Sequence, residues 1–366
     1  GAIYNFNGQT GRYPEIKMVW WAGGNPFHHH QDLNELSSAW ERPDTVIVQE
    51  PFWTPTARRA DIVLPSTTPL ERNDLGGAEN MLISHGKAVE APGDALDDYQ
   101  ILEMVAERLG IKDQFTEGRT ADQWVEVLYE IFRAENDWAP NFEQFREAGY
   151  LRHPEMSEMG ENEQVFLAEY RDDPTVHPLG TPSGRIELWS ETIAEFDYDD
   201  CPPHPTWIEP FERLGGKGSE HWPLHLVSNQ PTSRLHSQYD HTEPSQGSKV
   251  AGREPIRIHP QIAEERGICD GDVVRVFNDR GTCLAGAVID DSLMPEVVQL
   301  STGAWYDPDD DGMCRAGNPN VLTRDKGTSQ LAQGPSAHTC LVEIERFEGP
   351  APRVESYDPP SFAVDG

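Results

Sequence analysis

The sequence predicts a mixed fold class, in which an α/β part with a partial parallel sheet precedes an all-β part that closes into a barrel. Two observations predict it. Between residues 17 and 65, apolar and β-branched runs are separated by a glycine turn and a helix-like segment, the order of a βαβ unit, which implies a parallel sheet. Beyond about residue 222, apolar residues recur at every second position, which is typical of strands.

Three runs define the α/β part. Lys17 to Ala22 is apolar and predicts a buried strand, which the turn Gly23 to Pro26 ends. Residues 31 to 40 then have helical spacing, and residues 46 to 48 and 61 to 64 are further β-branched runs. Because ligands of such sheets bind beyond the carboxyl ends of the strands, we expect a ligand near the glycine turn.

Helices and a long connection follow this sheet. Helical patterns cover Asp98 to Leu109, Asp122 to Arg133 and Phe142 to Gly149. Residues 150 to 222 are rich in proline and glycine, and only Gly184 to Ser190 alternates like a strand. We therefore interpret most of this stretch as a connection between two domains.

The second half contains the strands of the predicted barrel. Strand patterns cover residues 224–229, 256–260, 272–281, 282–290 and 339–347. A hairpin turn is expected at Asn278 to Gly281, and a short helix at His259 to Arg266. The predicted organisation is an α/β domain with its connection at residues 1–215, a nucleotide-binding barrel domain at 216–350 and a tail at 351–366.

The chain is strongly acidic. Its 366 residues carry 63 Asp and Glu against 29 Lys and Arg, a formal net charge of -34. Nucleic-acid binding depends on clustered positive charge, so DNA and RNA are excluded as partners. Only 6 of the basic residues are Lys, which fits either adaptation to high salt or an ordinary acidic protein. No apolar run approaches the roughly 20 residues that span a bilayer, so no transmembrane segment is expected.

Three consecutive histidines, His28 to His30, follow the glycine turn. Consecutive side chains point to different sides of a helix or strand, so a metal site here is disfavoured. The 5 cysteines form no C-x-x-C pair, which indicates neither a disulfide framework nor a thiolate zinc site. The turn at Gly24 and Asn25 allows close approach of a nucleotide to the backbone, although a plain βα turn has the same pattern.

Two polar segments offer many hydrogen-bonding side chains. "SNQPTSRLHSQ" at residues 228–238 leaves a predicted strand and suits a phosphate or the edge of a heterocycle. "GNPNVLTRDKGTSQLAQG" at 317–334 is similar, and either segment is equally compatible with a polar surface loop. Arg58 and Arg59 follow a strand of the α/β sheet, where they meet either a phosphate or local carboxylates.

An ordered set of segments resembles a known family. The set comprises "WWAGGNPF", "QEPFWTPTARRADIVLP", "ERND", "SNQPTSRLHSQ", "GREPIRIHP", "GDVVRVFNDRG", "WYDP" and "GTSQLAQG". In this order they resemble the carboxyl-terminal half of the molybdopterin oxidoreductases of the dimethyl sulfoxide reductase family. The similar branch contains the trimethylamine-N-oxide, dimethyl sulfoxide and biotin sulfoxide reductases.

The resemblance implies a bis(molybdopterin guanine dinucleotide) molybdenum cofactor, and a second domain that is a six-stranded double-psi β-barrel. It implies that a guanine nucleotide contacts Gly24, Asn25, Gln49, Ser66 and Asp98, and that the pterin and pyrophosphate groups contact Arg234, His236, Ser237, Gln238, Asn320 and Gln333. In this branch a serine oxygen from the amino-terminal half binds the metal. No part of this chain matches that region, so we assign no metal ligand and no catalytic residue.

The function implied is reduction of an S-oxide or N-oxide by oxygen-atom transfer, with electrons from a cytochrome or another redox protein. We expect this chain to be the cofactor-binding half of such an enzyme and to be inactive alone. The alternatives are another branch of the family, of formate dehydrogenase or nitrate reductase type, and a non-catalytic nucleotide-binding protein. Relatives occur in the periplasm and in the cytoplasm, so the compartment is left open.

Overall fold

The computed structural model describes residues 2–78, 81–153 and 165–360. The chain divides into two compact units. The first contains Gly1–Val48, Trp53–Ile62 and Leu188–Gly366, and the second contains Gln49–Phe52 and Val63–Glu187. Of the predicted tail, residues 361–366 lie outside the described residues.

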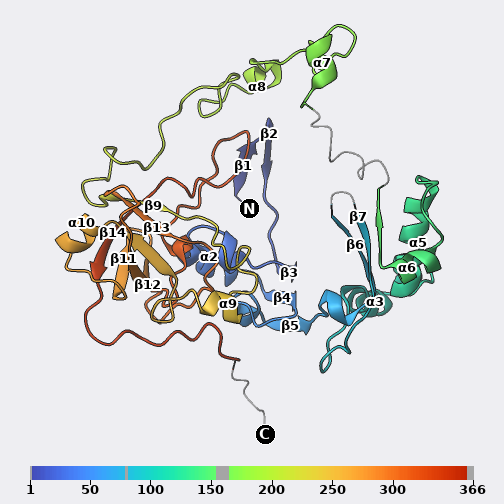
Figure 1. The fold of residues 1–366 in the computed structure, drawn as a ribbon, viewed down its shortest axis with the longest axis horizontal. Coiled ribbons are helices and arrows are strands. Elements are labelled where there is room, and N and C mark those ends of the chain that lie inside the picture. Colours follow the sequence, from blue (N-terminus) through green and yellow to red (C-terminus); the bar gives the residue numbers. More distant parts are fainter. Residues whose placement is uncertain (1, 79–80, 154–164, 361–366) are drawn as a thin grey trace. The chain divides into compact units, whose positions relative to one another are not determined.

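A closed β-barrel dominates the first unit (Figure 1). Its strands pair in the order β10-β12-β11-β14-β9-β13. β10 pairs with β12, and β9 with β13, in parallel, and the other neighbours are antiparallel. The prediction of a closed barrel is therefore confirmed, and its strands are β9 (Leu224–Val227), β10 (Pro255–Ile258), β11 (Val273–Phe277), β12 (Thr282–Ile289), β13 (Val297–Leu300) and β14 (Cys340–Arg346).

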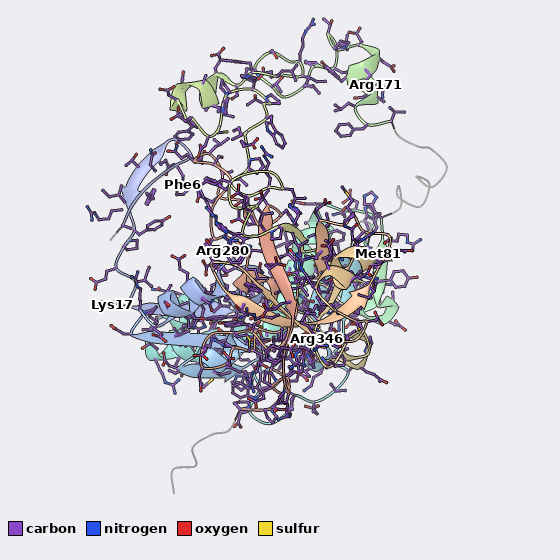
Figure 2. All side chains as sticks on the ribbon, turned by 90° about the vertical axis from the view of Figure 1, so that its left-hand side faces the viewer. Phe6, Lys17, Met81, Arg171, Arg280 and Arg346 are labelled. Carbon is purple, nitrogen blue, oxygen red and sulfur yellow. The ribbon has the colours of Figure 1, made fainter. Side chains whose placement is uncertain are left out.

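The period-two pattern explains the barrel core. Leu224 and Leu226 are buried, whereas their neighbours in β9 are only partly so, and Val274 and Val276 repeat this in β11. Side chains crowd around these strands in Figure 2, where the label Arg346 marks the last residue of β14. The predicted hairpin is confirmed, because β11 and β12 pair up to the turn.

The predicted strand, turn, helix and strand of the α/β part are also confirmed. β3 (Met18–Ala22), β4 (Thr45–Glu50) and β5 (Ile62–Pro65) form a parallel sheet in this order. α1 (Pro26–His29) and α2 (Leu33–Trp40) lie between β3 and β4 in the chain. The two turn glycines have φ values of 69° and 79°, a left-handed conformation that favours glycine.

An antiparallel hairpin at the start of the chain and a sheet in the second unit were not predicted from the sequence. The hairpin joins β1 (Ile3–Phe6) and β2 (Gln9–Arg12), and the sheet has the order β6-β7-β8. The sheet strands are β6 (Asp74–Ala78), β7 (Met81–His85) and β8 (Tyr150–Arg152). β6 contains two glycines and no β-branched residue, so it lacks the signals that predict strands.

The predicted helices of the second unit are confirmed as α3 (Asp98–Arg108), α5 (Ala121–Ala134) and α6 (Phe142–Ala148), and α4 (Lys112–Thr116) is an additional short helix. Capping boxes at the starts of α3, α5 and α6 satisfy backbone N–H groups that would otherwise be unpaired. α5 and α6 pack through Tyr129 and Phe145, whose rings are stacked 4.4 Å apart.

The predicted strand at Gly184 to Ser190 is wrong. These residues form bends and irregular backbone, and Ile186 and Leu188 are largely exposed. Alternation alone does not make a strand, because a strand needs a partner for its backbone hydrogen bonds. The surrounding connection instead contains the short helices α7 (Ala168–Asp172) and α8 (Glu191–Phe196).

The remaining short helical elements of the first unit are η1 (Ala57–Arg59), α9 (Glu243–Gln246), α10 (Pro260–Glu265) and η5 (Pro319–Val321), and η2 (Pro69–Glu71) belongs to the second unit. α10 confirms the helix that was predicted after β10. Within the ranges that the structure describes, no helix has the length and apolar character needed to cross a membrane.

Salt is expected to stabilise this chain. With a net charge of -34, the excess carboxylates repel one another in the folded state, and counterions screen that repulsion. We expect the midpoint of thermal unfolding to rise by at least about 5 °C between 0.1 and 2 M KCl, measured by circular dichroism. An unchanged or lower midpoint would support the ordinary acidic protein instead of a salt-adapted one.

Candidate functional site

The glycine turn after β3 is held against the loop that leaves β9. Asn25 is 6% exposed, and its Nδ2 donates to Ser237 Oγ at 3.2 Å. Its Oδ1 accepts from Thr56 Oγ1 at 2.6 Å. The fold therefore joins two predicted cofactor-binding residues that are 212 positions apart in the sequence.

The segment around η5 meets the same turn. Asn320 Nδ2 donates to the carbonyl oxygen of His28, and Asn318 Nδ2 donates to Phe27 O at 3.4 Å. The rings of Phe27 and Tyr306 are stacked, with centroids 5.9 Å apart and planes 6° apart. Asn320 thus joins Asn25 and Ser237 at one place, where loops of the barrel surround α1.

The loop after β9 has an unusual backbone. Ser237 is buried, whereas His236 and Gln238 are exposed. His236 has a φ of 51° and Tyr239 a φ of 61°, left-handed conformations that cost free energy in residues other than glycine. Arg234 is 7% exposed and lies in a network of buried charges, so its guanidinium is already engaged within the protein.

His28 was not among the residues that the sequence assigned to the site. It is 2% exposed, and neither of its ring nitrogens has a hydrogen-bond partner among the described residues. Burial, together with His29 and His236, lowers the pKa of His28 to about 3, so the ring stays neutral. Its ring lies 5.6 Å from that of His236, between centroids. A buried ring with both nitrogens unpaired is the kind of group that a bound molecule satisfies.

Replacing His28 by leucine tests this unpaired state. His28→Leu removes two unsatisfied buried nitrogens, so the free energy of unfolding at pH 7 should be unchanged or higher by about 1 kcal/mol. The unfolded chain binds a proton at His28 below pH 6.5, whereas the folded chain does so only near pH 3, so this ring makes stability fall as the pH falls between those values.

The variant should therefore show a flatter decline of stability between pH 6.5 and 4 in urea unfolding experiments. His30→Leu, a change next to α1, is the control and should keep the wild-type decline. A clear loss of stability in His28→Leu at pH 7 would show that the ring is satisfied after all.

Gln49, Ser66 and Asp98 belong to the second unit. Gln49 is 1% exposed at the end of β4, and its Nε2 donates to Asp98 Oδ1 at 2.8 Å. Ser66 is 7% exposed, and its backbone forms an isolated parallel β-bridge with Leu96. The fold thus pairs two of these three predicted residues. Next to Gln49, burial raises the pKa of Glu50 to about 7, a perturbation that has no signal in the sequence.

Gln333 and Gly24 are exposed. Gln333 Nε2 donates to Ser329 O at 3.1 Å, within its own loop. That loop is anchored by Gln330, whose N–H donates to the Asp200 carboxylate and whose carbonyl accepts from Asn7. Among the described residues, the side chain of Gln333 therefore makes no hydrogen bond to Asn25, Ser237 or Asn320, whereas the amides of Asn25 and Asn320 bond to groups of that cluster.

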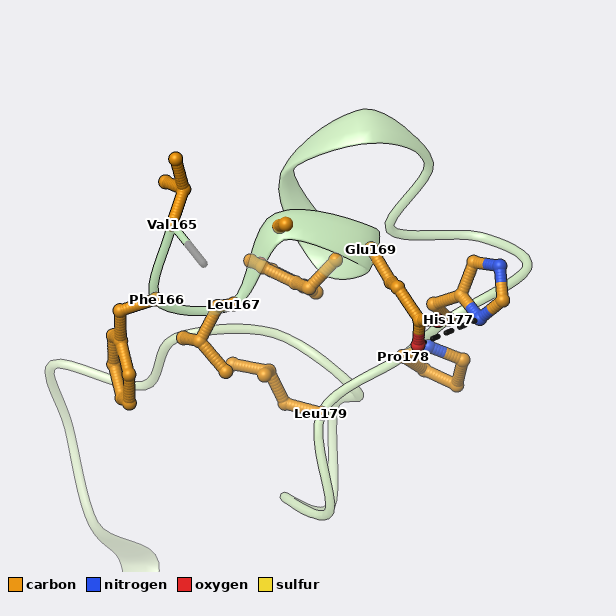
Figure 3. A pocket seen from close by; sticks show the side chains of 9 residues that line it. Val165, Phe166, Leu167, Glu169, His177, Pro178 and Leu179 are labelled. Atoms are coloured by element: carbon orange, nitrogen blue, oxygen red, sulfur yellow. Dashed lines mark ion pairs between the residues drawn. The ribbon is translucent and has the colours of Figure 1, made fainter. Parts of the chain in front are cut away.

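Two further features contribute no site. Among the described residues, no three His, Cys, Asp or Glu side chains are grouped so as to hold a metal ion. A hollow at residues 165–179 is lined largely by apolar side chains such as Phe166 and Leu179, with the ion pair His177 Nδ1 to Glu169 Oε2 at 3.7 Å (Figure 3). It contains none of the residues predicted from the sequence to bind a cofactor.

In the first unit, a glycine turn at the end of a parallel strand is held against loops of a closed barrel by neutral amides, and turns of this kind are places where nucleotide-type cofactors bind. Family models name the class of protein. "Molybdopterin oxidoreductase" matches residues 7–108, and "Molydopterin dinucleotide binding domain" matches residues 224–341. The chain belongs to the molybdopterin oxidoreductase family, and these two models indicate a molybdenum cofactor with pterin dinucleotides.

Curated relatives show which members of this family the chain is similar to. The chain is 47% identical to a dimethyl sulfoxide/trimethylamine N-oxide reductase of Cereibacter sphaeroides, over 99% of this chain and 45% of that protein. It is 46% identical to a biotin sulfoxide reductase of the same organism, over 96% and 47%. A trimethylamine-N-oxide reductase of Haemophilus influenzae is also 46% identical, over 98% and 45%. The chain thus spans somewhat less than half of the length of these relatives.

A solved structure supports the fold. Acetylene hydratase from Pelobacter acetylenicus superposes with a TM-score of 0.70 at 18% identity, covering 90% of this chain and 44% of that one. At this identity the likeness concerns the fold alone.

Proposed function

We propose that this chain is the cofactor-binding carboxyl-terminal half of a molybdenum-dependent S-oxide or N-oxide reductase. The overall reaction converts the oxide, two electrons and two protons into the reduced compound and water. The names of the relatives support this substrate class. The observation that carries the proposal is the contact of Asn25 with Ser237 and of Asn320 with the carbonyl of His28.

The residues present fit a pterin dinucleotide. Neutral amides and hydroxyls suit an anionic organic cofactor in a protein with few basic residues, and the unpaired nitrogens of His28 lie among them. We propose the set inferred from the resemblance: Gly24, Asn25, Gln49, Ser66 and Asp98 toward a guanine nucleotide, and Arg234, His236, Ser237, Gln238, Asn320 and Gln333 around the pterins and pyrophosphates. When bound, the cofactor supplies the redox chemistry, and the protein binds and orients it.

The finer architecture is part of the proposal. We propose that residues 1–215 form the α/β domain with its connection and residues 216–350 a barrel of the double-psi type. Two parallel pairs in an otherwise antiparallel barrel support this barrel type. We further propose that a cytochrome or another redox protein supplies the electrons. The alternatives are another branch, of formate dehydrogenase or nitrate reductase type, and a non-catalytic nucleotide-binding protein.

The decisive experiment uses the full-length protein in which this sequence lies. We expect the purified protein to contain molybdenum by mass spectrometry, to release guanine nucleotide on acid hydrolysis, and to oxidise reduced methyl viologen with dimethyl sulfoxide or trimethylamine N-oxide. Activity with nitrate or formate instead would favour another branch. Purified protein that contains no molybdenum would overturn the proposed activity, and only the alternative of a non-catalytic nucleotide-binding protein would then remain.

A further inference from the structure

A network of buried charges lies at the loop that leaves β9. Its members are Arg234, Asp240, Lys249 and Glu254, whose side chains are 0% to 2% exposed. Arg234 Nη2 lies 2.9 Å from Glu254 Oε2, and Arg234 Nε lies 3.4 Å from Asp240 Oδ1. Lys249 Nζ lies 2.7 Å from each of the same two oxygens. Two cations balance two anions, so no charge in the network is buried without compensation.

The network fixes both ends of a five-residue loop, residues 235–239. Arg234 precedes this loop and Asp240 follows it. Asp240 Oδ2 also accepts the backbone N–H of Trp305 at 2.9 Å, and the Trp305 indole N–H donates to Ser237 O at 2.9 Å, in the middle of the loop. The loop is therefore anchored at three points while it emerges from the barrel.

Between these anchors, the loop presents the residues proposed to meet the cofactor. His236 and Tyr239 are left-handed, and the side chains of His236 and Gln238 are exposed. Ser237 is turned inward and accepts from Asn25. Strained backbone persists only where its surroundings determine it fully, and such places are typical of ligand-binding loops.

We propose that Arg234, Asp240, Lys249 and Glu254 are positioning residues, which hold residues 235–239 in the conformation that meets the cofactor. The inference rests on the proposed function, and it changes the role of Arg234 from a cofactor contact to a support. Besides its two carboxylate partners, the Arg234 guanidinium donates to Ser245 Oγ at 3.1 Å and to Thr302 O at 2.7 Å. These bonds leave its charge facing the protein interior.

A carboxylate elsewhere in the same unit supplies a matched control. Asp307 is also buried, pairs with Arg315 at 2.7 Å and accepts the backbone N–H of Glu355 at 2.8 Å. Asp240 similarly accepts from the C-terminal segment, through the Tyr357 hydroxyl at 2.6 Å. Asp240→Asn and Asp307→Asn are thus the same change in comparable surroundings, and only Asp240 anchors the loop.

The test uses the full-length protein prepared without its cofactor, and it measures the binding of guanosine diphosphate by calorimetry and the hydrogen exchange of residues 235–239. Asp240→Asn should weaken binding about tenfold and speed hydrogen exchange in residues 235–239, because these residues lose the contacts that hold them in the binding conformation. Asp307→Asn should change affinity less than about twofold. The double variant Lys249→Met with Glu254→Gln keeps net charge at zero and should also weaken binding, which covers the case in which Asp240→Asn does not fold.

The outcomes separate this inference from the proposed function. Equal affinity in the wild type and in either folded network variant overturns the positioning role and leaves the proposed function intact. An equal loss in Asp307→Asn also overturns it, because the effect is then general destabilisation. A wild-type full-length protein that binds no guanosine diphosphate overturns the proposed nucleotide site and the inference with it.

Discussion

Replacing Gly303 by alanine is expected to destabilise the first unit by about 3 kcal/mol or more, the range of severe single substitutions. A Cβ atom at this position would lie 1.9 Å from His236 O and 2.7 Å from Arg234 Nε. Neither atom can move freely, since one is backbone and the other belongs to a buried guanidinium. Gly303 also has a φ of 101°, where alanine is strained.

Gly271→Ala is a control that separates backbone strain from the steric clash of an added Cβ atom. Gly271 has a φ of 84°, but nothing lies within 4 Å of the position that a Cβ atom would occupy there. This control should cost only about 1 to 2 kcal/mol, the free energy of placing a residue with a side chain in the left-handed region. Urea unfolding followed by circular dichroism measures both. Equal losses in the two variants would show that the backbone conformation, and not the approach of the loop after β9, makes glycine necessary at position 303.

Replacing Arg280 by methionine is expected to destabilise the barrel by about 3 kcal/mol. Arg280 is labelled in Figure 2 and makes two bonds to Glu212, Nη1 to Oε1 at 2.6 Å and Nη2 to Oε2 at 3.0 Å. Both side chains are about 10% exposed, so removing the cation leaves the Glu212 carboxylate buried beside the backbone N–H of Leu341 and the more exposed Arg324.

The double variant Arg280→Met with Glu212→Gln supplies the control. Removing both charges avoids an uncompensated carboxylate, so the double variant should be more stable than Arg280→Met alone. Thermal and urea unfolding of the two proteins check this. A double variant that is as unstable as, or less stable than, the single one would mean that packing of the arginine, rather than its charge, stabilises the connection against β14.

Local signals account for most of the elements that were predicted correctly. The turn Asn278 to Gly281 has the residues that hairpins favour, and the glycines after β3 have the left-handed conformation that their position required. β13 was missed, because its four residues lie close behind a proline and have few neighbours in sequence to show a period. Gly184 to Ser190 has the right period but finds no partner strand.

Local sequence motifs also explain which residues of the candidate site were predicted and which were missed. Asn25, Ser237 and Asn320 were predicted to contact the cofactor from ordered motifs, and the structure brings these three residues to one turn. The sequence did not indicate that Arg234 is enclosed by Asp240, Lys249 and Glu254, because an arginine in a polar loop looks the same whether it faces a phosphate or a carboxylate. His28 was likewise hidden among three neighbouring imidazoles.

The sequence by itself determined the βαβ order of the first sheet, five of the six barrel strands, the helices α3, α5 and α6, and the family to which the motifs belong, because backbone preference and motif order depend on neighbouring residues. Only the tertiary structure decided which polar side chains meet and which are buried. Asn25 contacts Ser237 across 212 positions, and the charge on Arg234 is neutralised by the buried carboxylates of Asp240 and Glu254. Burial and long-range pairing depend on how the chain packs, which no local stretch encodes.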